Sequence, residues 1–275
     1  MIYLAVALGV EAKPIIKYYN LKRDNEIKKV QIFRNEEIVL IITGVGILKS
    51  AISLSFILSK FDIKEDDIFI NIGVCGSNNK FIIGDIVICN KIINSELKKS
   101  YYPDMIFKHT FKEGSLESFN TPVYSDVGII GDIVDMEGAG LAEASSYFFK
   151  SYQINFIKII SDYLSNNVKS EDIENLIEKS LPKIDKWLGE RKEFKVEKEI
   201  KFSTEEEKVV NELIEKCKFT ATMKNELEDI LIYYKLLGKD ILNILDKYKE
   251  LEIKDKRDSK RILEEIRYGE RKNGK

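Results

Sequence analysis

The stretch IYLAVALGVEAKPIIKYY, residues 2–19, combines two patterns that together indicate an α/β fold. Residues 2–8 form a continuous apolar run with the length of a buried strand. Residues 11–19 have the apolar spacing of a helix, with Pro14 in the first turn, where a helix tolerates proline. A buried strand that leads directly into a helix is typical of a crossover unit, so we expect a sheet with helices packed on it.

The same alternation continues as far as residue 188. We expect buried strands at 29–34, 37–43, 67–73, 81–94 and 155–161, and helices at 47–61, 137–149 and 170–188. Residues 95–133 have a mixed composition, and there we expect loops and short strands. The sequence therefore predicts an α/β domain over residues 1–190, a twisted mixed β-sheet flanked by helices.

A different composition follows the charged residues 189–201 and indicates an α-helical C-terminal extension over residues 200–275. Ser203 and Glu206 have the spacing of a capping box at a helix start. Farther along, apolar side chains step by three and four residues and predict one seam along a helix: Met223, Leu227, Ile230, Tyr234, Leu237 and Ile241. We expect this extension, to which the sequence assigns no role, to pack on itself.

The composition excludes several classes of protein. The hydrophobic share of 44% and the charged share of 33% are ordinary for a globular protein, and a net charge of −2 favours no nucleic-acid partner. No apolar run approaches the roughly 18 residues of a membrane span, and the N-terminus lacks a signal-peptide pattern, so we expect a cytoplasmic protein without membrane contact. The three cysteines lack CxxC spacing and His109 is the one histidine, so we expect no metal site and no cofactor.

Four separated regions carry the signal for function. They are ALGVEAKP (7–14), ITGVG (42–46), INIGVCGSNNKFIIGDIVI (70–88), and VDMEGAGLAEAS (134–145) followed by IKIISD (157–162). In this order they resemble the purine nucleoside phosphorylase and methylthioadenosine/S-adenosylhomocysteine (MTA/SAH) nucleosidase superfamily, over about residues 1–188. VDMEGAGLAE and IISD are the most specific parts. The resemblance implies an enzyme of nucleoside metabolism that cleaves the N-glycosidic bond of a purine nucleoside.

Asp162 is the first candidate for catalysis, because it ends an apolar strand, where open α/β sheets bind ligands. A carboxyl group there can be desolvated and its pKa raised, which suits a proton donor. A cap of a turn or helix is the alternative interpretation. The resemblance implies that Asp162 protonates the purine at N7 as the glycosidic bond breaks, with Ser161 beside it in the binding site.

Glu11 and Lys158 are candidates for handling the nucleophile. Glu11 lies just past the first strand and would otherwise be a surface residue in the first turn of a helix. The resemblance implies that it is the base that deprotonates the attacking water. Lys158 stands between Ile157 and Ile159 on a buried strand, where a lone ammonium group is costly. It matches a position where the family has a basic residue, which would orient water or phosphate.

Met136 and Glu137 lie at a junction between a strand and a helix, where the helix dipole favours a carboxylate. Capping alone would explain Glu137, and a core position would explain Met136. The resemblance implies that Glu137 accepts hydrogen bonds from the ribose hydroxyls and that Met136 packs on the sugar. A carboxylate close to the ring also favours the positive charge of an oxocarbenium-like transition state.

The purine-facing loop is expected within residues 92–133, a region shorter than the family's by roughly one strand and one helix. LESFNTPV (116–123) is the best candidate. Phe119 would stack on the base and the backbone of Val123 would read its edge; a place in the hydrophobic core is the alternative interpretation of Phe119. Gly76 would let a ligand approach the backbone closely.

Water is favoured over phosphate as the nucleophile, because Asn71 stands where many phosphorylases have a phosphate-binding arginine. Lys13 or Lys158 would have to compensate. We therefore predict a nucleosidase for an MTA- or SAH-like purine nucleoside, assembled as a homodimer. A phosphate-dependent purine nucleoside phosphorylase is the first alternative. A catalytically silent nucleoside-binding or scaffold protein is the second, and the presence of both Asp162 and Glu11 argues against it.

Overall fold

The structure is a computed structural model that describes residues 1–165, 168–193, 202–248 and 256–268. It consists of two compact units, unit 1 (Met1–Lys195) and unit 2 (Val196–Lys275). Within the described residues, no helix has both the length and the apolar character needed to cross a membrane.

Unit 1 is built on a ten-stranded sheet in which β5 (Ile68–Ser77) has a central place. On one side, β1 (Ile2–Val6) pairs in parallel with β5 and with β4 (Ile38–Ile42). The antiparallel strands β3 (Gln31–Arg34) and β2 (Lys22–Asp24) extend the sheet beyond β4. All the residues of β1 are buried, which explains why this strand reads as an unbroken apolar run.

On the other side of β5, five strands pair in a closed ring. β5 pairs with β10 (Ile154–Asp162), β10 with β6 (Ile86–Asn94), and β6 with β8 (Lys112–Ser118). β8 then pairs with β9 (Ile133–Asp135), and β9 returns to β5. The short strand β7 (Ser100–Tyr101) pairs with β6 outside the ring. Ring closure places the ends of β8, β9 and β10 close to β5, although they are far apart in the sequence.

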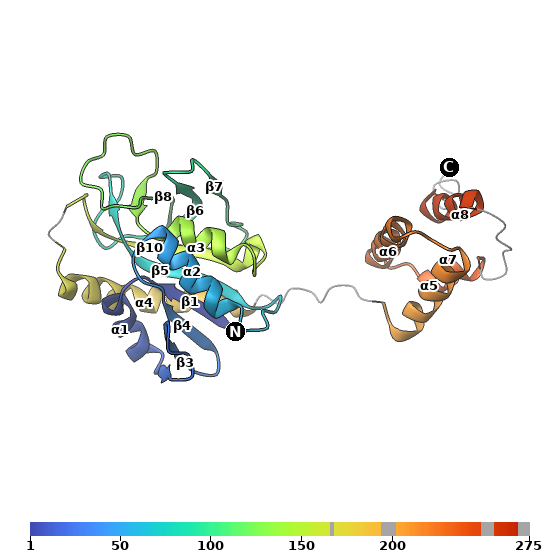
Figure 1. Cartoon of the computed structure of the whole chain (residues 1–275), viewed down its shortest axis with the longest axis horizontal. Coiled ribbons are helices and arrows are strands. Elements are labelled where there is room, and N and C mark those ends of the chain that lie inside the picture. Colours follow the sequence, from blue (N-terminus) through green and yellow to red (C-terminus); the bar gives the residue numbers. More distant parts are fainter. Residues whose placement is uncertain (166–167, 194–201, 249–255, 269–275) are drawn as a thin grey trace. The chain divides into compact units, whose positions relative to one another are not determined.

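Helices cover both faces of the sheet (Figure 1). α1 (Gly9–Tyr18) and α4 (Ser170–Glu193) contribute to one apolar core, and α2 (Ile47–Leu58) and α3 (Gly138–Ser145) contribute to the other. The sheet is therefore the middle of three layers, as expected for an α/β domain.

The small-residue face of α3 permits a close approach to α2. A Cβ atom at Gly140 would lie 2.0 Å from the carbonyl oxygen of Ile47, so a side chain there would push the two helices apart. The prediction that this helix continues to Phe149 is wrong, because it ends at Ser145 and the chain then turns so that Phe149 enters the core. The 3-10 helix η1 (Ser151–Gln153) leads into β10.

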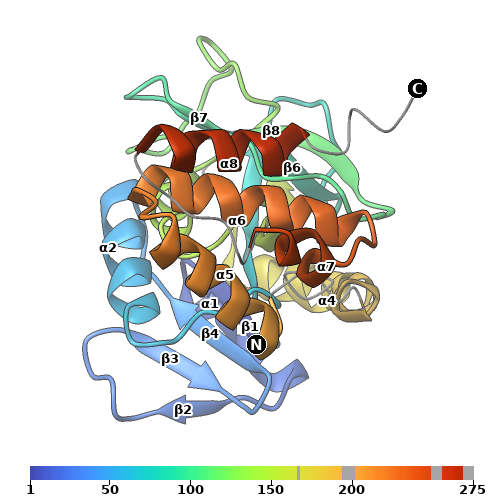
Figure 2. The ribbon, with the colours of Figure 1, turned by 90° about the vertical axis from the view of Figure 1, so that its right-hand side faces the viewer.

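Unit 2 contains α5 (Thr204–Lys216), α6 (Ala221–Leu236), α7 (Ile241–Asp246) and α8 (Lys256–Tyr268). In Figure 2, α8 lies beside α6, and the two helices are in contact. Side chains from all four helices and their connections form a separate apolar core: Val210, Leu213, Cys217, Leu227, Leu231, Tyr234, Ile241, Leu245, Tyr248, Ile262, Leu263 and Ile266. Unit 2 thus packs on itself.

The apolar seam predicted for this unit is not a single helix. α6 ends at Leu236, Gly238 has a φ angle of +71°, and the Asp240 side chain caps the start of α7. The glycine allows the left-handed backbone that ends a helix, so the apolar spacing runs across a break. Leu237 is consequently 52% exposed, whereas Leu231 is fully buried.

Leu227→Asp should unfold unit 2 and leave the melting of unit 1 unchanged. Leu227 is fully buried, and the substitution both removes a core side chain and buries a charge, which costs at least about 3 kcal/mol. Calorimetry and limited proteolysis of the full chain would measure the effect. Leu236→Asp, on the same helix at 64% exposure, is the matched control. Equal destabilisation by the two substitutions would contradict this description of the core.

Candidate active site

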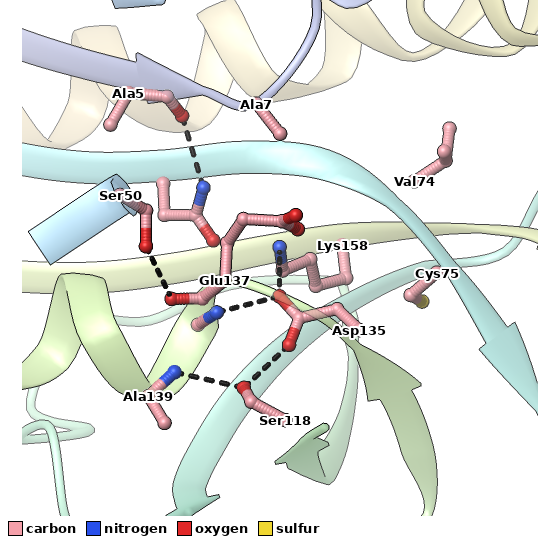
Figure 3. A network of polar contacts seen from close by, with 12 residues as sticks. Ala5, Ala7, Ser50, Val74, Cys75, Ser118, Asp135, Glu137, Ala139 and Lys158 are labelled. Carbon is pink, nitrogen blue, oxygen red and sulfur yellow. Dashed lines mark hydrogen bonds and ion pairs between the residues drawn. The ribbon is translucent and has the colours of Figure 1, made fainter. Parts of the chain in front are cut away.

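A buried ion pair lies inside the strand ring of unit 1. Lys158 projects from β10 toward Asp135 at the end of β9, and its Nζ lies 2.8 Å from Asp135 Oδ2 (Figure 3). Each of the two side chains is 2% exposed. Both strands pair with β5, so ring closure brings the two charges together. The buried ammonium noted in the sequence thereby has a carboxylate partner.

Asp135 has further donors from neighbouring elements. The hydroxyl of Ser118, at the end of β8, donates to its Oδ1 at 2.5 Å, and the backbone N–H of Gly138 donates to its Oδ2 at 2.9 Å. Ser118 Oγ in turn accepts from the N–H of Ala139 at 2.8 Å. Asp135 is not among the residues predicted from the sequence, although it lies inside the VDMEGAG motif and a buried Lys158 requires a buried carboxylate.

Glu137 is the N-cap residue of α3 and is 8% exposed. Its Oε1 accepts the N–H of Gly46 at 3.0 Å, and the Ser50 hydroxyl donates to its carbonyl oxygen at 3.3 Å. The ITGVG segment therefore forms a turn that holds this glutamate. Burial, followed by the negative charge of Asp135, raises the pKa of Glu137 to about 7, against the opposing effect of the Lys158 charge.

Glu11 is buried at 3% exposure in the first turn of α1, and is not a surface residue. Its Oε2 accepts the N–H groups of Ala7 and Leu8 at 3.0 and 2.9 Å, and its Oε1 accepts that of Val74 at 2.9 Å. A Cβ atom at Gly73 would lie 2.9 Å from Oε1, so the glycine leaves space at this oxygen. Burial raises the pKa of Glu11, although the three N–H donors act in the opposite direction.

Lys158 connects these groups electrostatically. Burial disfavours its ammonium form, but the charges of Asp135, Glu137 and Glu11 outweigh burial and raise the pKa of Lys158. The Lys158 charge in turn lowers the pKa of Glu11 and of Glu137. The structure therefore brings three carboxyl groups around one ammonium group, which we call the charged cluster: Glu11, Asp135, Glu137 and Lys158.

Asp162 lies at the other end of the site, at a bulge in β10. The register with β5 shifts between Ile160 and Asp162, and such bulges re-aim the side chains that follow them. Ser161 Oγ lies 3.1 Å from the Cys75 carbonyl oxygen and 2.7 Å from Asp162 Oδ2, while the N–H of Ser165 donates to Asp162 Oδ1 at 3.0 Å. Asp162 itself is half-buried, and it lines a hollow.

This hollow has a volume of about 270 Å³ and brings together several residues predicted from the sequence. It is lined by Gly76, Pro122, Val123, Tyr124, Val134, Asp135, Met136, Asp162, Leu164, Ser165 and Val168. Asp135 thus belongs to both the hollow and the charged cluster. Asp162 also lines a second hollow, of about 510 Å³. A third hollow, of about 970 Å³, lies against β2 and β3, and none of the predicted site residues lines it.

Phe119 does not line the hollow. It is half-buried immediately after β8, and its N–H donates to the Asp135 carbonyl oxygen at 2.9 Å. The first three residues of the predicted LESFNTPV loop, 116–118, belong to β8 and are buried. They are fixed there by pairing with β6 and β9, so the segment available to face a base begins later, around Pro122 and Val123.

Among the described residues, no three His, Cys, Asp or Glu side chains gather in a way that could hold a metal ion. The charged cluster has its positive charge built in as Lys158.

The chain is similar in structure to several crystallised nucleosidases. A mutant of the Helicobacter pylori MTA/SAH nucleosidase with 5′-methylthioadenosine in its active site gives a TM-score of 0.59 at 16% identity, with coverage of 69% of this chain and 98% of that one. The Streptococcus pneumoniae MTA/SAH nucleosidase with a transition-state inhibitor gives 0.58 at 18%, with coverage of 68% and 97%. Unit 1 has the MTA/SAH nucleosidase fold.

The nucleosidase fold confirms the predicted mixed sheet with flanking helices. An Arabidopsis thaliana 5′-methylthioadenosine nucleosidase in its apo form agrees, with a TM-score of 0.58 at 15% identity and coverage of 69% of this chain and 95% of that one. No protein-family model matches the sequence, and no curated protein matches it. The nucleosidase fold of unit 1 is thus established by structural similarity.

Glu137→Gln should stabilise the chain at pH 8 and have little effect at pH 5. Folding raises the pKa of Glu137 from its ordinary 4.5 to about 7, so its neutral form stabilises the folded state at low pH and this contribution is lost as the pH rises through 7. Glutamine mimics the neutral form, with a gain of at most about 3 kcal/mol. Thermal unfolding at both pH values measures it, with the exposed Glu36→Gln as control. A pH-independent difference would argue against a raised pKa.

Proposed function

We propose that unit 1 hydrolyses the N-glycosidic bond of a purine nucleoside of the MTA or SAH type. The observation that carries this proposal is the presence of two carboxyl groups in different surroundings at one end of the sheet. Asp162 is half-buried beside the hollow, and Glu11 is buried within the charged cluster. A leaving group that needs a proton and a nucleophile that must lose one require such a pair.

Asp162 is the proposed general acid. Ser161 has a single hydroxyl proton for two acceptors, Cys75 O and Asp162 Oδ2. When Asp162 carries its own proton, it can donate to Ser161 Oγ while Ser161 donates to the Cys75 carbonyl. With a purine seated in the hollow, the Asp162 carboxyl would turn this proton from Ser161 Oγ to N7 and donate it as the bond to the ribose breaks and its electron pair moves onto the base.

Glu11 is the proposed general base. A carboxylate offers about four lone-pair positions, and three of those of Glu11 are taken by backbone N–H groups, two at Oε2 and one at Oε1. Oε1 therefore keeps one position for a water molecule, and Gly73 leaves it the room. The raised pKa makes Glu11 a stronger base. Water would add its oxygen to C1′ of the ribose and transfer one proton to Glu11.

Glu137 and Met136 are proposed to hold the ribose. Glu137 Oε1 accepts the Gly46 N–H, so its other oxygen would meet the ribose hydroxyls. Met136 lines the hollow that would hold the base, directly before Glu137 in the chain. Sugar and base would thus be fixed by neighbouring residues, and the Glu137 charge would favour an oxocarbenium-like transition state.

Water is favoured over phosphate, because each group that would bind phosphate is already engaged within the protein. Asn71 Nδ2 donates to the Ala5 carbonyl at 3.0 Å. Lys13 pairs with Glu174 at 2.8 Å on the surface, and Lys158 pairs with Asp135. A phosphate nucleophile would have to displace one of these partners.

Asp162→Asn should lower turnover by at least about 100-fold, the low end of general acid contributions, with little loss of ligand binding. The assay measures free base from methylthioadenosine, S-adenosylhomocysteine, adenosine and inosine, each with and without phosphate. Asp126→Asn, on the exposed part of the loop that borders the hollow, is the control. Near-normal turnover in Asp162→Asn would remove this residue from the mechanism.

Glu11→Gln should abolish hydrolysis, because glutamine cannot accept the proton of water. If water is the nucleophile, the rate of the wild type should also be the same with and without phosphate. Glu171→Gln, in the exposed first turn of α4, is the matched control. Strict phosphate dependence of the wild type would identify a phosphorylase. Nucleoside binding without any release of base would identify a silent binding protein.

A further inference from the structure

Asp135 has no role in the proton transfers described above, yet it touches both parts of the site. We propose that Asp135 is a positioning residue for the proposed reaction: it holds the Lys158 ammonium beside Glu11 and Glu137 and so decides which buried carboxyl group keeps a proton. This inference rests on the proposed function, since the protonation of Glu11 and Glu137 matters only for a site that moves protons.

The first support is the way in which Asp135 is held. Its carboxylate accepts from Ser118 on β8, from the Gly138 N–H at the start of α3 and from Lys158 on β10, so three elements fix its position. With both oxygens engaged and the side chain 2% exposed, the carboxylate has no solvent-facing alternative. The position of the Lys158 ammonium is therefore set by Asp135.

The second support is the charge around Glu137. The titratable groups that act on it are Asp135 from β9, Glu11 from α1 and Lys158 from β10. Asp135 and Glu11 favour its neutral form, whereas Lys158 favours its ionised form. Because Asp135 both repels a charge on Glu137 and occupies Lys158, its two effects act in the same direction.

The third support is the location of Asp135 at the hollow. It lines the hollow together with Met136 and Asp162, and its backbone carbonyl accepts the N–H of Phe119. A ligand in the hollow would thus lie against the residue that controls the charged cluster. An aspartate that only stabilised the fold would not set the pH dependence of the reaction.

The test is a carbon-13 NMR titration of the Glu137 carboxyl in the full chain, assigned by its loss in Glu137→Gln. In the wild type the midpoint should lie near 7. Asp135→Asn should lower it by at least about one pH unit, because a like charge nearby is removed and Lys158 becomes free to pair with Glu137 and Glu11. Asp135→Glu, which retains the charge, should restore a midpoint close to that of the wild type.

An unchanged or raised midpoint in a folded Asp135→Asn would overturn the proposal. If this variant does not fold, the double variant Asp135→Asn/Lys158→Met removes both charges of the pair, a replacement that buried pairs often tolerate. Compared with Lys158→Met alone, the double variant should again have the lower Glu137 midpoint. Equal midpoints in these two variants would equally overturn the proposal.

Activity gives a separate measurement. In the base-release assay, Asp135→Asn should move the acid limb of the pH profile of kcat/KM to lower pH by about the same amount as the NMR midpoint, roughly one pH unit. A loss of rate without such a shift would indicate a structural role. A wild-type chain that releases no base would remove the proposed function, while the titration would still decide whether Asp135 governs the protonation of Glu137.

Discussion

The buried ion pair between Lys158 and Asp135 is the constraint on which the arrangement of unit 1 depends. A buried ammonium without its carboxylate would be strongly destabilising, so the strands that carry the two residues must meet. They meet because β9 and β10 both pair with β5 and the ring of strands closes through β6 and β8. Glu11 and Glu137 then lie against a charge whose position is already fixed.

Glu11 and Glu137 can be buried because backbone N–H groups donate hydrogen bonds to their carboxylates. Each stands in or next to the first turn of a helix, and each accepts N–H groups from a segment distant in the sequence, Val74 for Glu11 and Gly46 for Glu137. A glycine-containing part of strand β5 and the turn at Gly46 therefore serve as partners of carboxylates. The ITGVG segment, whose glycines alone would indicate only a turn, supplies the N–H group that binds Glu137.

Most of the sheet could be predicted from the sequence, because strands such as β1 and β4 are buried on both faces and appear as apolar runs. β8 could not, since its polar Glu117 and Ser118 are buried, and the groups that contact Glu117 Oε2 and Ser118 Oγ come from elements that only the tertiary structure brings together. The apolar seam of unit 2 predicted one helix where the structure has two, because the apolar spacing continues across the break at Gly238. Asp135 was missed because its importance lies in a partner, Lys158, that is distant in sequence.

The outer strand β2 has a consequence for how the chain behaves at high concentration. It ends the sheet beyond β3, is three residues long, and exposes Lys22 and Arg23. A short edge that carries like charges is a poor template for another strand, because a second copy would bring the same charges against it. This end of the sheet is therefore protected against edge-to-edge aggregation by its length and its charge.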